Sequence, residues 1–293
     1  MRLIFILMIF FLGCAAALAD LSSLSLSMVP KSVTSNEDYV YFINEEKTIH
    51  QYSHEGKLLK KIVCPEPFYV MMILKNGNLA LFRENTIMIL DPETEELHSF
   101  EVKHRHFAIH ENDIYLTEKN ILKDTQENII ASFDTDVYSM ASVPGHLFIA
   151  TEDGLITRLD YINNKWTVSA TAQREPKPLL EAADGILVSR YFSPYEMYIS
   201  GYDLENAEKV SSEAYALKVI NKNTIVGQSL QDLYIWTEAD KKWKLQIYPY
   251  GSYFQDLSRH NNHTFFVSTS GKITRYRYIA NEWKSDIFVE YYP

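Results

Sequence analysis

Three histidines with short spacings are the side chains of this 293-residue chain that most readily suggest a metal site: His104, His106 and His110. Imidazole is a common zinc ligand, and the spacing of His106 and His110 would suit two ligands on one helix. The residues around them predict a strand instead, in which a rise of about 3.3 Å per residue separates positions four apart by about 13 Å. His104 and His106 can point the same way, but no third ligand is identifiable. We therefore interpret these histidines as solvated or hydrogen-bonded, and predict no metal.

Patterns that indicate catalysis are missing from the sequence. It holds no Gly-x-Ser-x-Gly elbow, no His-Glu-x-x-His, no phosphate loop and no dinucleotide fingerprint. Two carboxylates acting on a glycoside need a defined separation, which a sequence does not supply. Six acids fall on loops that we place at one end of the molecule, and we interpret them as solvated: Glu45, Glu46, Glu84, Glu118, Glu152 and Asp153. We predict no catalytic residue and no cofactor.

Aromatic and arginine side chains suggest partner recognition as another chemistry. The loop from Tyr191 to Glu196 presents aromatic rings around a proline, and such rings on a rigid loop often anchor protein contacts. Arginine recognises planar carboxylates and phosphates, and four arginines fall on loops at the same end. The candidate partner-binding residues are Tyr191, Phe192, Tyr195, Arg83, Arg105, Arg174 and Arg190. The alternative is that the rings pack inward and the arginines are merely solvated.

An internal repeat indicates the elements that position these residues. Residues 154–166 and 271–283 share the pattern G-x-I-T-R-x-x-Y-I-x-N-x-W, with eight of thirteen positions identical and no gap. The offset is 117 residues, three times 39, and residues 146–150 and 263–267 lie at the same offset. Self-similarity at such a period is typical of solenoids and propellers.

A weaker form of the repeat runs along the whole chain. Short apolar runs begin at spacings of 40, 35, 33, 39, 38 and 41 residues, near Tyr39, Leu79, Ile114, Leu147, Ile186, Thr224 and Phe265. Each run has one strand before it and two after it, separated by Gly or Asn turns that suit hairpins. Seven units of four short antiparallel strands predict an all-β, seven-bladed β-propeller. The third unit is the weakest, because Ile121 to Asp124 is a thin strand.

In this architecture the chain resembles the broad quinoprotein-like and WD40-like group of β-propellers. The resemblance covers nearly all of residues 20–293, but the Gly-His…Trp-Asp signature, the kelch double glycine and the sialidase box are absent. It therefore implies the fold, with function at one end of a central channel. The loops there enter each inner strand or join the second and third strands.

Two repeated features are interpreted as packing. The pairs Thr157-Arg158 and Thr274-Arg275 sit at matching positions, which indicates inter-blade packing or hydrogen bonding. Trp166, Trp243 and Trp283 are interpreted as outer-strand packing residues. The segment from Leu21 to Val29 alternates well, and we expect it to form the inner strand of the first blade or to join the last blade.

The first nineteen residues predict a secretory signal peptide. Arg2 precedes an apolar run from Leu3 to Leu12, and Ala17-Leu18-Ala19 is a small-x-small cleavage site. Ten apolar residues are too few to cross a bilayer, which needs about twenty. Residues 20–293 then form a single propeller domain. In the alternative, Phe11-Leu12-Gly13-Cys14 resembles a bacterial lipobox and Cys14 is lipidated.

Two further residues are candidates for modification or burial. Asn262 begins the single glycosylation sequon, Asn262-His263-Thr264. Cys64 is the only thiol left after cleavage at Ala19, and such a cysteine is most often a small buried apolar residue.

Composition narrows the class of partner. With 28 basic and 38 acidic residues and a charge of −10, the chain is a poor non-specific nucleic-acid ligand. Two cysteines exclude a disulfide framework. We predict a secreted, lumenal or periplasmic protein-interaction scaffold that is not an enzyme and that meets a membrane only if lipidated. The alternatives are a propeller hydrolase or lyase with its site at the channel mouth, and a lipidated outer-membrane assembly scaffold.

Overall fold

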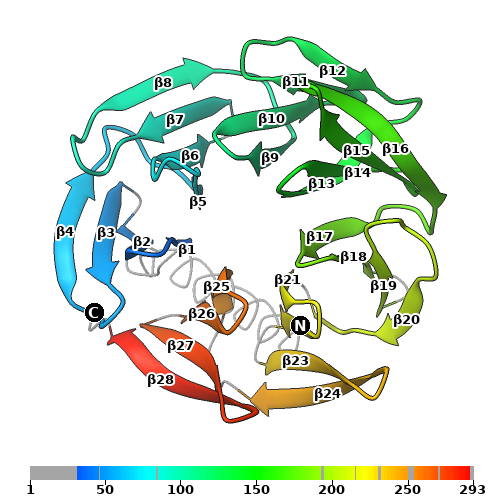
Figure 1. Cartoon of the computed structure of the whole chain (residues 1–293). Coiled ribbons are helices and arrows are strands. Elements are labelled where there is room, and N and C mark those ends of the chain that lie inside the picture. Colours follow the sequence, from blue (N-terminus) through cyan, green and yellow to red (C-terminus); the bar gives the residue numbers. More distant parts are fainter. Residues whose placement is uncertain are drawn as a thin grey trace, which may run out of the picture.

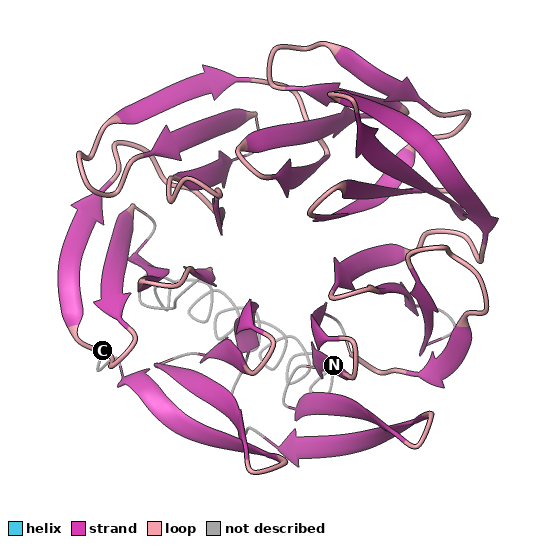
Figure 2. Ribbon diagram, in the orientation of Figure 1, coloured by secondary structure: helices cyan, strands magenta, loops and turns pink. Residues whose placement is uncertain are grey.

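Seven four-stranded antiparallel sheets surround a central channel in the computed structural model (Figures 1 and 2). The structure describes residues 32–45, 47–83, 85–192, 195–214, 216–229, 232–249, 254–269 and 271–290. In every sheet the strands follow each other in chain order, and we letter them A to D from the channel outward. The prediction of a seven-bladed all-β propeller is confirmed.

The blades are built from consecutive stretches of the chain. Blades 1 and 2 are β1 (Val33–Ser35), β2 (Tyr39–Glu45), β3 (Thr48–Ser53), β4 (Leu58–Val63), β5 (Val70–Ile73), β6 (Leu79–Arg83), β7 (Thr86–Leu90) and β8 (Leu97–Glu101). Blades 3 and 4 are β9 (His106–His110), β10 (Asp113–Glu118), β11 (Ile121–Asp124), β12 (Ile129–Ser132), β13 (Val137–Val143), β14 (His146–Thr151), β15 (Leu155–Ile162) and β16 (Lys165–Gln173). Blades 5, 6 and 7 are β17 (Leu179–Ala183), β18 (Ile186–Phe192), β19 (Tyr195–Gly201), β20 (Glu208–Ser211), β21 (Ala216–Asn221), β22 (Thr224–Gln228), β23 (Asp232–Ala239), β24 (Lys242–Pro249), β25 (Phe254–Asn261), β26 (Thr264–Thr269), β27 (Lys272–Ile279) and β28 (Glu282–Glu290).

Burial explains why the second strand of each blade reads as a continuous apolar run. Both faces of a B strand pack against neighbouring blades, so five consecutive residues of β14 are buried, whereas the D strand β16 is mostly exposed. The core consists of clusters that each join two adjacent blades, as where Phe148 of blade 4 meets Leu187 of blade 5. Aromatic rings pack in these interfaces; Phe82 stacks on Phe107 of the next blade with ring centroids 3.7 Å apart.

The third blade is complete but short at its outer edge. Its strands β11 and β12 have four residues each, whereas β15 and β16 of blade 4 have eight and nine. The thin strand predicted at Ile121 to Asp124 is confirmed.

The propeller closes without sharing a strand between the two ends of the described chain. Blade 1 is β1 to β4 and blade 7 is β25 to β28. The inner strand of blade 1 is Val33–Ser35, not the segment from Leu21 to Val29, which lies outside the described residues. The predicted signal peptide, its cleavage site and Cys14 lie outside them as well.

Strand register corrects the predicted alignment of the repeat. Phe148 lies opposite Arg158, and Phe266 lies opposite Arg275. The arginines are 117 residues apart but the phenylalanines are 118 apart, so the second strands match one residue later than the ungapped comparison suggests. His260 is an extra bulged residue in β25, and the turn between β26 and β27 is one residue shorter than that between β14 and β15. These two changes cancel.

The arginines of the repeated Thr-Arg pairs connect neighbouring blades through hydrogen bonds. Arg158 donates from Nη1 to the carbonyl of Tyr202 in blade 5, at 2.7 Å. Arg275 donates likewise to the carbonyl of His54 in blade 1. Trp166, Trp243 and Trp283 pack from their outer strands against the core clusters. The interpretation of the two arginines as inter-blade hydrogen-bonding residues and of the three tryptophans as outer-strand packing residues is confirmed.

Candidate functional site

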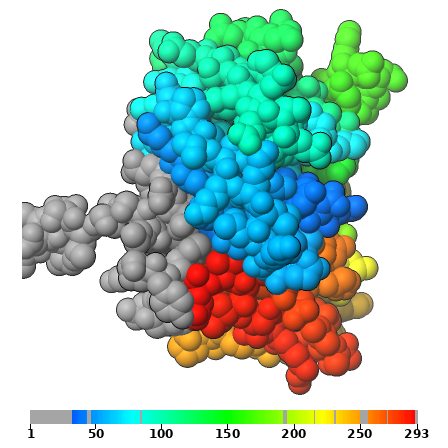
Figure 3. All heavy atoms as spheres, turned by 90° about the vertical axis from the view of Figure 1, so that its left-hand side faces the viewer, coloured from blue at the N-terminus to red at the C-terminus, as the bar shows by residue number. Residues whose placement is uncertain are grey.

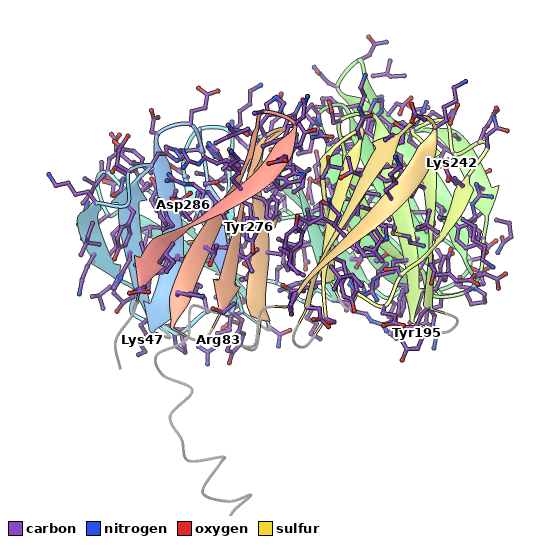
Figure 4. The ribbon with its side chains drawn as sticks, turned by 90° about the horizontal axis from the view of Figure 1, so that it is seen from below. Lys47, Arg83, Tyr195, Lys242, Tyr276 and Asp286 are labelled. Atoms are coloured by element: carbon purple, nitrogen blue, oxygen red, sulfur yellow. The ribbon has the colours of Figure 1, made fainter. Side chains whose placement is uncertain are left out.

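The antiparallel order of the strands gives the propeller two faces. The D–A face carries the loops into the inner strands and the B-to-C turns, and the A–B face carries the A-to-B and C-to-D turns. Lys47, Arg83 and Tyr195 lie at the D–A face and Lys242 lies toward the A–B face in Figure 4. The sequence places its candidate partner-binding residues at the D–A face.

The three candidate aromatics separate into different environments. Tyr191 is buried within β18 at 2% exposure, and its ring meets Tyr198 edge-on at 5.6 Å. Burial raises the pKa of Tyr191 to about 12. Tyr195 begins β19 and is 55% exposed. Phe192 ends β18, and its side chain lies outside the described part. Of the two described rings, only that of Tyr195 is available to a partner.

Arg83 and Arg105 lie at the surface of the D–A face, in ion pairs. Arg83 contacts Glu66 at 2.8 Å. Arg105 reaches across to blade 4, contacting Asp136 at 3.7 Å and Glu152 at 3.3 Å. All these side chains are more than a third exposed, so each pair contributes at most about 1 kcal/mol to stability. Both guanidinium groups remain accessible from solvent.

Arg174 and Arg190 donate hydrogen bonds to backbone carbonyls of the protein itself. Arg174 donates from Nη2 to the carbonyl of Leu204 in blade 5, at 2.7 Å. Arg190 was expected on a loop but lies within β18, is 2% exposed, and donates from Nη1 to the carbonyl of Ala214 at 2.7 Å. Burial lowers the pKa of Arg190 to about 10. These two arginines join neighbouring blades.

The central channel is a cavity of about 600 Å³ lined by the inner strands of the blades. Its charged side chains come from consecutive inner strands in blades 5 to 7, and the sequence analysis did not identify them. Lys218 of β21 contacts Glu181 of β17 at 2.5 Å. Asp256 of β25 accepts a hydrogen bond of 2.8 Å from the backbone N–H of Val33 in blade 1. Burial raises the pKa of Asp256, while the bond from Val33 and the charge of Lys218 oppose that rise.

These channel residues are engaged with one another and with the backbone. Glu181 neutralises Lys218, and Asp256 joins the inner strands of blades 7 and 1. Each would be a plausible acid or base by type, but each already has a structural partner. What brings these residues together is the register of the inner strands around the channel. A sequence does not show this register before the blades are assembled.

The histidines of blade 3 do not form a metal centre. His106 and His110 stand at opposite ends of β9, as the strand prediction requires. The Nδ1 of His104 lies 3.1 Å from the carbonyl of Val102, and burial lowers the pKa of His106 to about 4. Across the described ranges, no group of three or more His, Cys, Asp or Glu side chains is placed to hold a metal ion.

The remaining predicted residues have the following positions. Asn262 is half-buried in the A-to-B turn of blade 7, where its amide oxygen accepts a bond from Arg259. Cys64 is buried in the core between blades 1 and 2, which raises the pKa of its thiol to about 11 and confirms its expected burial. Glu152 contacts Arg105, Glu118 contacts Lys123, and Asp153 accepts bonds from Thr135 and Thr151. Glu46, Glu84 and the side chain of Glu45 lie outside the described part.

Comparisons with known proteins support the fold and no closer relationship. No protein-family model matches the sequence, and no curated protein matches it. PorZ, described as an essential bacterial surface component of the type-IX secretion system of Porphyromonas gingivalis, is similar with a TM-score of 0.63 and 12% identity. That match covers 89% of this chain and 38% of PorZ, so the chain spans well under half of PorZ.

Two further structures show the same likeness. The WD40 β-propeller domain of Doa1 has a TM-score of 0.62 and 13% identity over 85% of this chain and 92% of that domain. The computationally designed protein Ika8 has a TM-score of 0.61 and 11% identity over 87% of this chain and 98% of its own. At these identities the similarity shows the propeller fold alone. No helix that could span a membrane occurs in the described residues.

Proposed function

We propose that this chain is an exported, non-catalytic scaffold that holds a protein partner on its D–A face. The observation that supports this most is the distribution of exposed side chains there. Tyr195 at the start of β19 is 55% exposed; Tyr69, just before β5, is 48% exposed, and Val70, its first residue, is 37% exposed. Together with the accessible guanidinium groups of Arg83 and Arg105, these exposed side chains give the D–A face the composition of a protein contact surface.

The channel residues support a scaffold more than an enzyme. A hydrolase or lyase needs an acid or base that is free to exchange protons with a substrate. Glu181, Lys218 and Asp256 instead bond to one another or to the backbone. Fold likeness to a WD40 domain and to a bacterial surface component agrees with a binding role, by analogy.

A cross-linking experiment in the native host tests the proposed face. The tagged chain, the triple variant Arg83→Ala/Arg105→Ala/Tyr195→Ala and the control Lys242→Ala, on the other face, are cross-linked and their partners are quantified. We expect a partner that the wild type and Lys242→Ala retain and that the triple variant loses. The same partners on all three proteins would contradict the D–A face, and hydrolysis or elimination by the purified chain would contradict the non-catalytic role.

Export has its own measurement. Mass spectrometry of the mature N-terminus is expected to find Asp20 as the first residue. A lipidated Cys14 would replace the soluble scaffold with a membrane-anchored one. An intact Met1 on the cellular protein would contradict export.

A further inference from the structure

A groove of about 670 Å³ crosses the A–B face over the end of blade 3. The outer strands β11 and β12 of blade 3 have four residues each, whereas β15 and β16 of the adjacent blade 4 have eight and nine. The longer β15–β16 hairpin of blade 4 stands beside the groove and projects from the molecule in green at the upper right of Figure 3. The volume falls within the range of about 300–1,000 Å³ that is usual for small-ligand sites.

Aromatic rings form one wall of this groove. Tyr161 and Trp166 face each other across the β15–β16 hairpin, with ring centroids 4.9 Å apart. Tyr115 fixes the indole edge-on at 5.4 Å, while the Tyr161 ring is 39% exposed. An aromatic face carries partial negative charge, which attracts the C–H bonds on the apolar side of a sugar ring.

Side-chain amides form the opposite rim. The Oδ1 of Asn112 accepts the backbone N–H of Asn76, and the Oδ1 of Asn76 accepts that of Asn78. These bonds occupy the amide oxygens and leave the NH₂ groups of Asn76 and Asn112 able to donate. Within the described ranges, these two NH₂ groups have no protein partner. Asp113, in the same lining, supplies a carboxylate acceptor. Donors and acceptors side by side suit hydroxyl groups, because a hydroxyl both donates and accepts.

The balance of charge in the lining favours a neutral ligand. Amides come from Asn76, Asn78, Asn112, Gln126 and Asn164, whereas the charged groups are two aspartates and one lysine. Of these, Asp124 holds its own turn by accepting the N–H groups of Gln126 and Asn128. A strongly charged peptide or an anion would find few complementary groups.

The repeat provides a smaller copy of the groove between blades 6 and 7. Tyr278, Asn281 and Trp283 line a cavity of about 420 Å³, at the positions that Tyr161, Asn164 and Trp166 occupy in blade 4. Blade 6 has outer strands of eight residues each, which fill more of the space. The blade 7 copy therefore serves as an internal control with the same aromatic pair.

We propose that the groove over blade 3 binds a short neutral oligosaccharide. One sugar ring stacks on Tyr161, and its hydroxyls bond to the amides of Asn112 and Asn164 and to the carboxylate of Asp113. This site lies on the face opposite the proposed protein contact and does not depend on it.

Titration calorimetry of the whole chain tests this site. The probes are maltotriose, cellotriose, xylotriose, mannotriose and tri-N-acetylchitotriose. We expect saturable binding of at least one probe, about tenfold weaker binding by Tyr161→Ala and a smaller change in Tyr161→Phe, which keeps the ring. Asn164→Gly, which keeps the left-handed turn conformation at φ 61° without the amide, is expected to bind several-fold more weakly, by about the value of one hydrogen bond.

The matched variant Tyr278→Ala controls for the loss of a tyrosine ring outside the groove. It removes the equivalent ring in blade 7 and is expected to leave the affinity within about twofold, a difference of less than 0.5 kcal/mol. Circular dichroism and thermal unfolding confirm that each variant is folded. The proposal is overturned if no probe binds at millimolar concentration or if folded Tyr161→Ala retains wild-type affinity.

Discussion

The interface between blades 4 and 5 and the seam between blades 7 and 1 use the same repeated residues for different tasks. The chain itself joins blade 4 to blade 5, whereas blades 7 and 1 come from the two ends of the described chain. Ser139 of β13 contacts the N–H of Leu180 in blade 5, and Asp256, at the same position in β25, contacts the N–H of Val33 in blade 1. Side chains at equivalent positions therefore join both pairs of blades.

The seam adds contacts that the chain-linked interface lacks. The inserted His260 lies 3.1 Å from the hydroxyl of Ser35, and its ring is 4.5 Å from that of His54. Phe288, a bulged residue of β28, packs on Tyr52 and Phe266. Contacts between side chains therefore hold blades 7 and 1 together without an exchanged strand.

The two boundaries also differ in which blade fills the space between them. In blade 5, Leu204 follows the arginine-bound carbonyl of Tyr202 by two residues and is buried in the interface. In blade 1, Gly56 follows the carbonyl of His54 by two residues and lies beneath the backbone of Phe288. A glycine is needed there because the neighbouring blade occupies the space.

Replacing Gly56 should break the seam most severely. Gly56 has φ +85°, and an added Cβ would lie 2.8 Å from the carbonyl oxygen of Phe288. We expect Gly56→Ala to lower the free energy of unfolding by about 3 kcal/mol, from backbone strain and the clash together. Gly145 has φ +82° with no atom within 4 Å, so Gly145→Ala should cost only about 1 kcal/mol. Urea unfolding measures both; equal losses would mean that the seam is not closely packed at Gly56.

Removing the repeated arginines compares the two boundaries directly. Arg275 bonds to His54 and Asp286 and lies 5.4 Å from the ring of Phe288, while Arg158 bonds to Tyr202, Asp160 and Ser169. We expect Arg275→Ala to cost about 2–3 kcal/mol and Arg158→Ala about 1–2 kcal/mol in unfolding free energy. Limited proteolysis should then release blade 1 or blade 7 first in Arg275→Ala alone. A larger loss of unfolding free energy in Arg158→Ala than in Arg275→Ala would contradict the stronger role of the arginine at the seam.

Acid should weaken the seam through His260. Burial, with a smaller effect of His54, lowers the pKa of His260 from 6.5 to about 4. The folded state keeps this imidazole neutral while the unfolded chain binds a proton, so stability present above pH 6.5 is lost as the pH falls toward 4. After allowance for partial exposure, we expect the wild type to lose about 1–2 kcal/mol more than His260→Asn between these values. Parallel pH profiles for the two proteins would contradict this role.

The smallest expected effect concerns the charge of Asp256. Asp256→Asn keeps an oxygen that accepts the Val33 N–H and removes a carboxylate whose pKa is raised by burial, and Lys218 retains Glu181. We therefore expect a change within about 1 kcal/mol, and about 1–3 kcal/mol of destabilisation for Asp256→Ala, which leaves the N–H unpaired. Ser139→Ala is the matched change in blade 4, because it removes the equivalent contact with the N–H of Leu180. A large loss in Asp256→Asn would show that the charge itself holds the seam.

The internal repeat made most of the fold predictable, because the same four-stranded unit recurs along the chain at a nearly constant spacing. The apolar runs predicted to begin near Leu79, Ile186 and Thr224 begin at those residues, as β6, β18 and β22. The inserted His260 was invisible because a compensating shortening in the next turn preserved the offset of 117. An ungapped comparison cannot reveal two changes that cancel.

The candidate site was less predictable because side-chain direction depends on tertiary packing. Arg190 and Tyr191 resemble loop anchors in the sequence, but β18 continues through them and both are buried. Glu181, Lys218 and Asp256 are far apart in the chain and meet only around the channel. The groove over blade 3 depends on the shortness of β12, whose consequence appears only when the longer blade 4 stands beside it.

Native-state hydrogen exchange at low denaturant tests most directly whether side chains close this ring as firmly as the chain joins its other blades. We predict that the protected amides of β2, β3, β26 and β27 open with the same free energy as those of β14, β15, β18 and β19. Opening of blade 1 or blade 7 at a free energy several kcal/mol below that of blades 4 and 5 would contradict a closed seam.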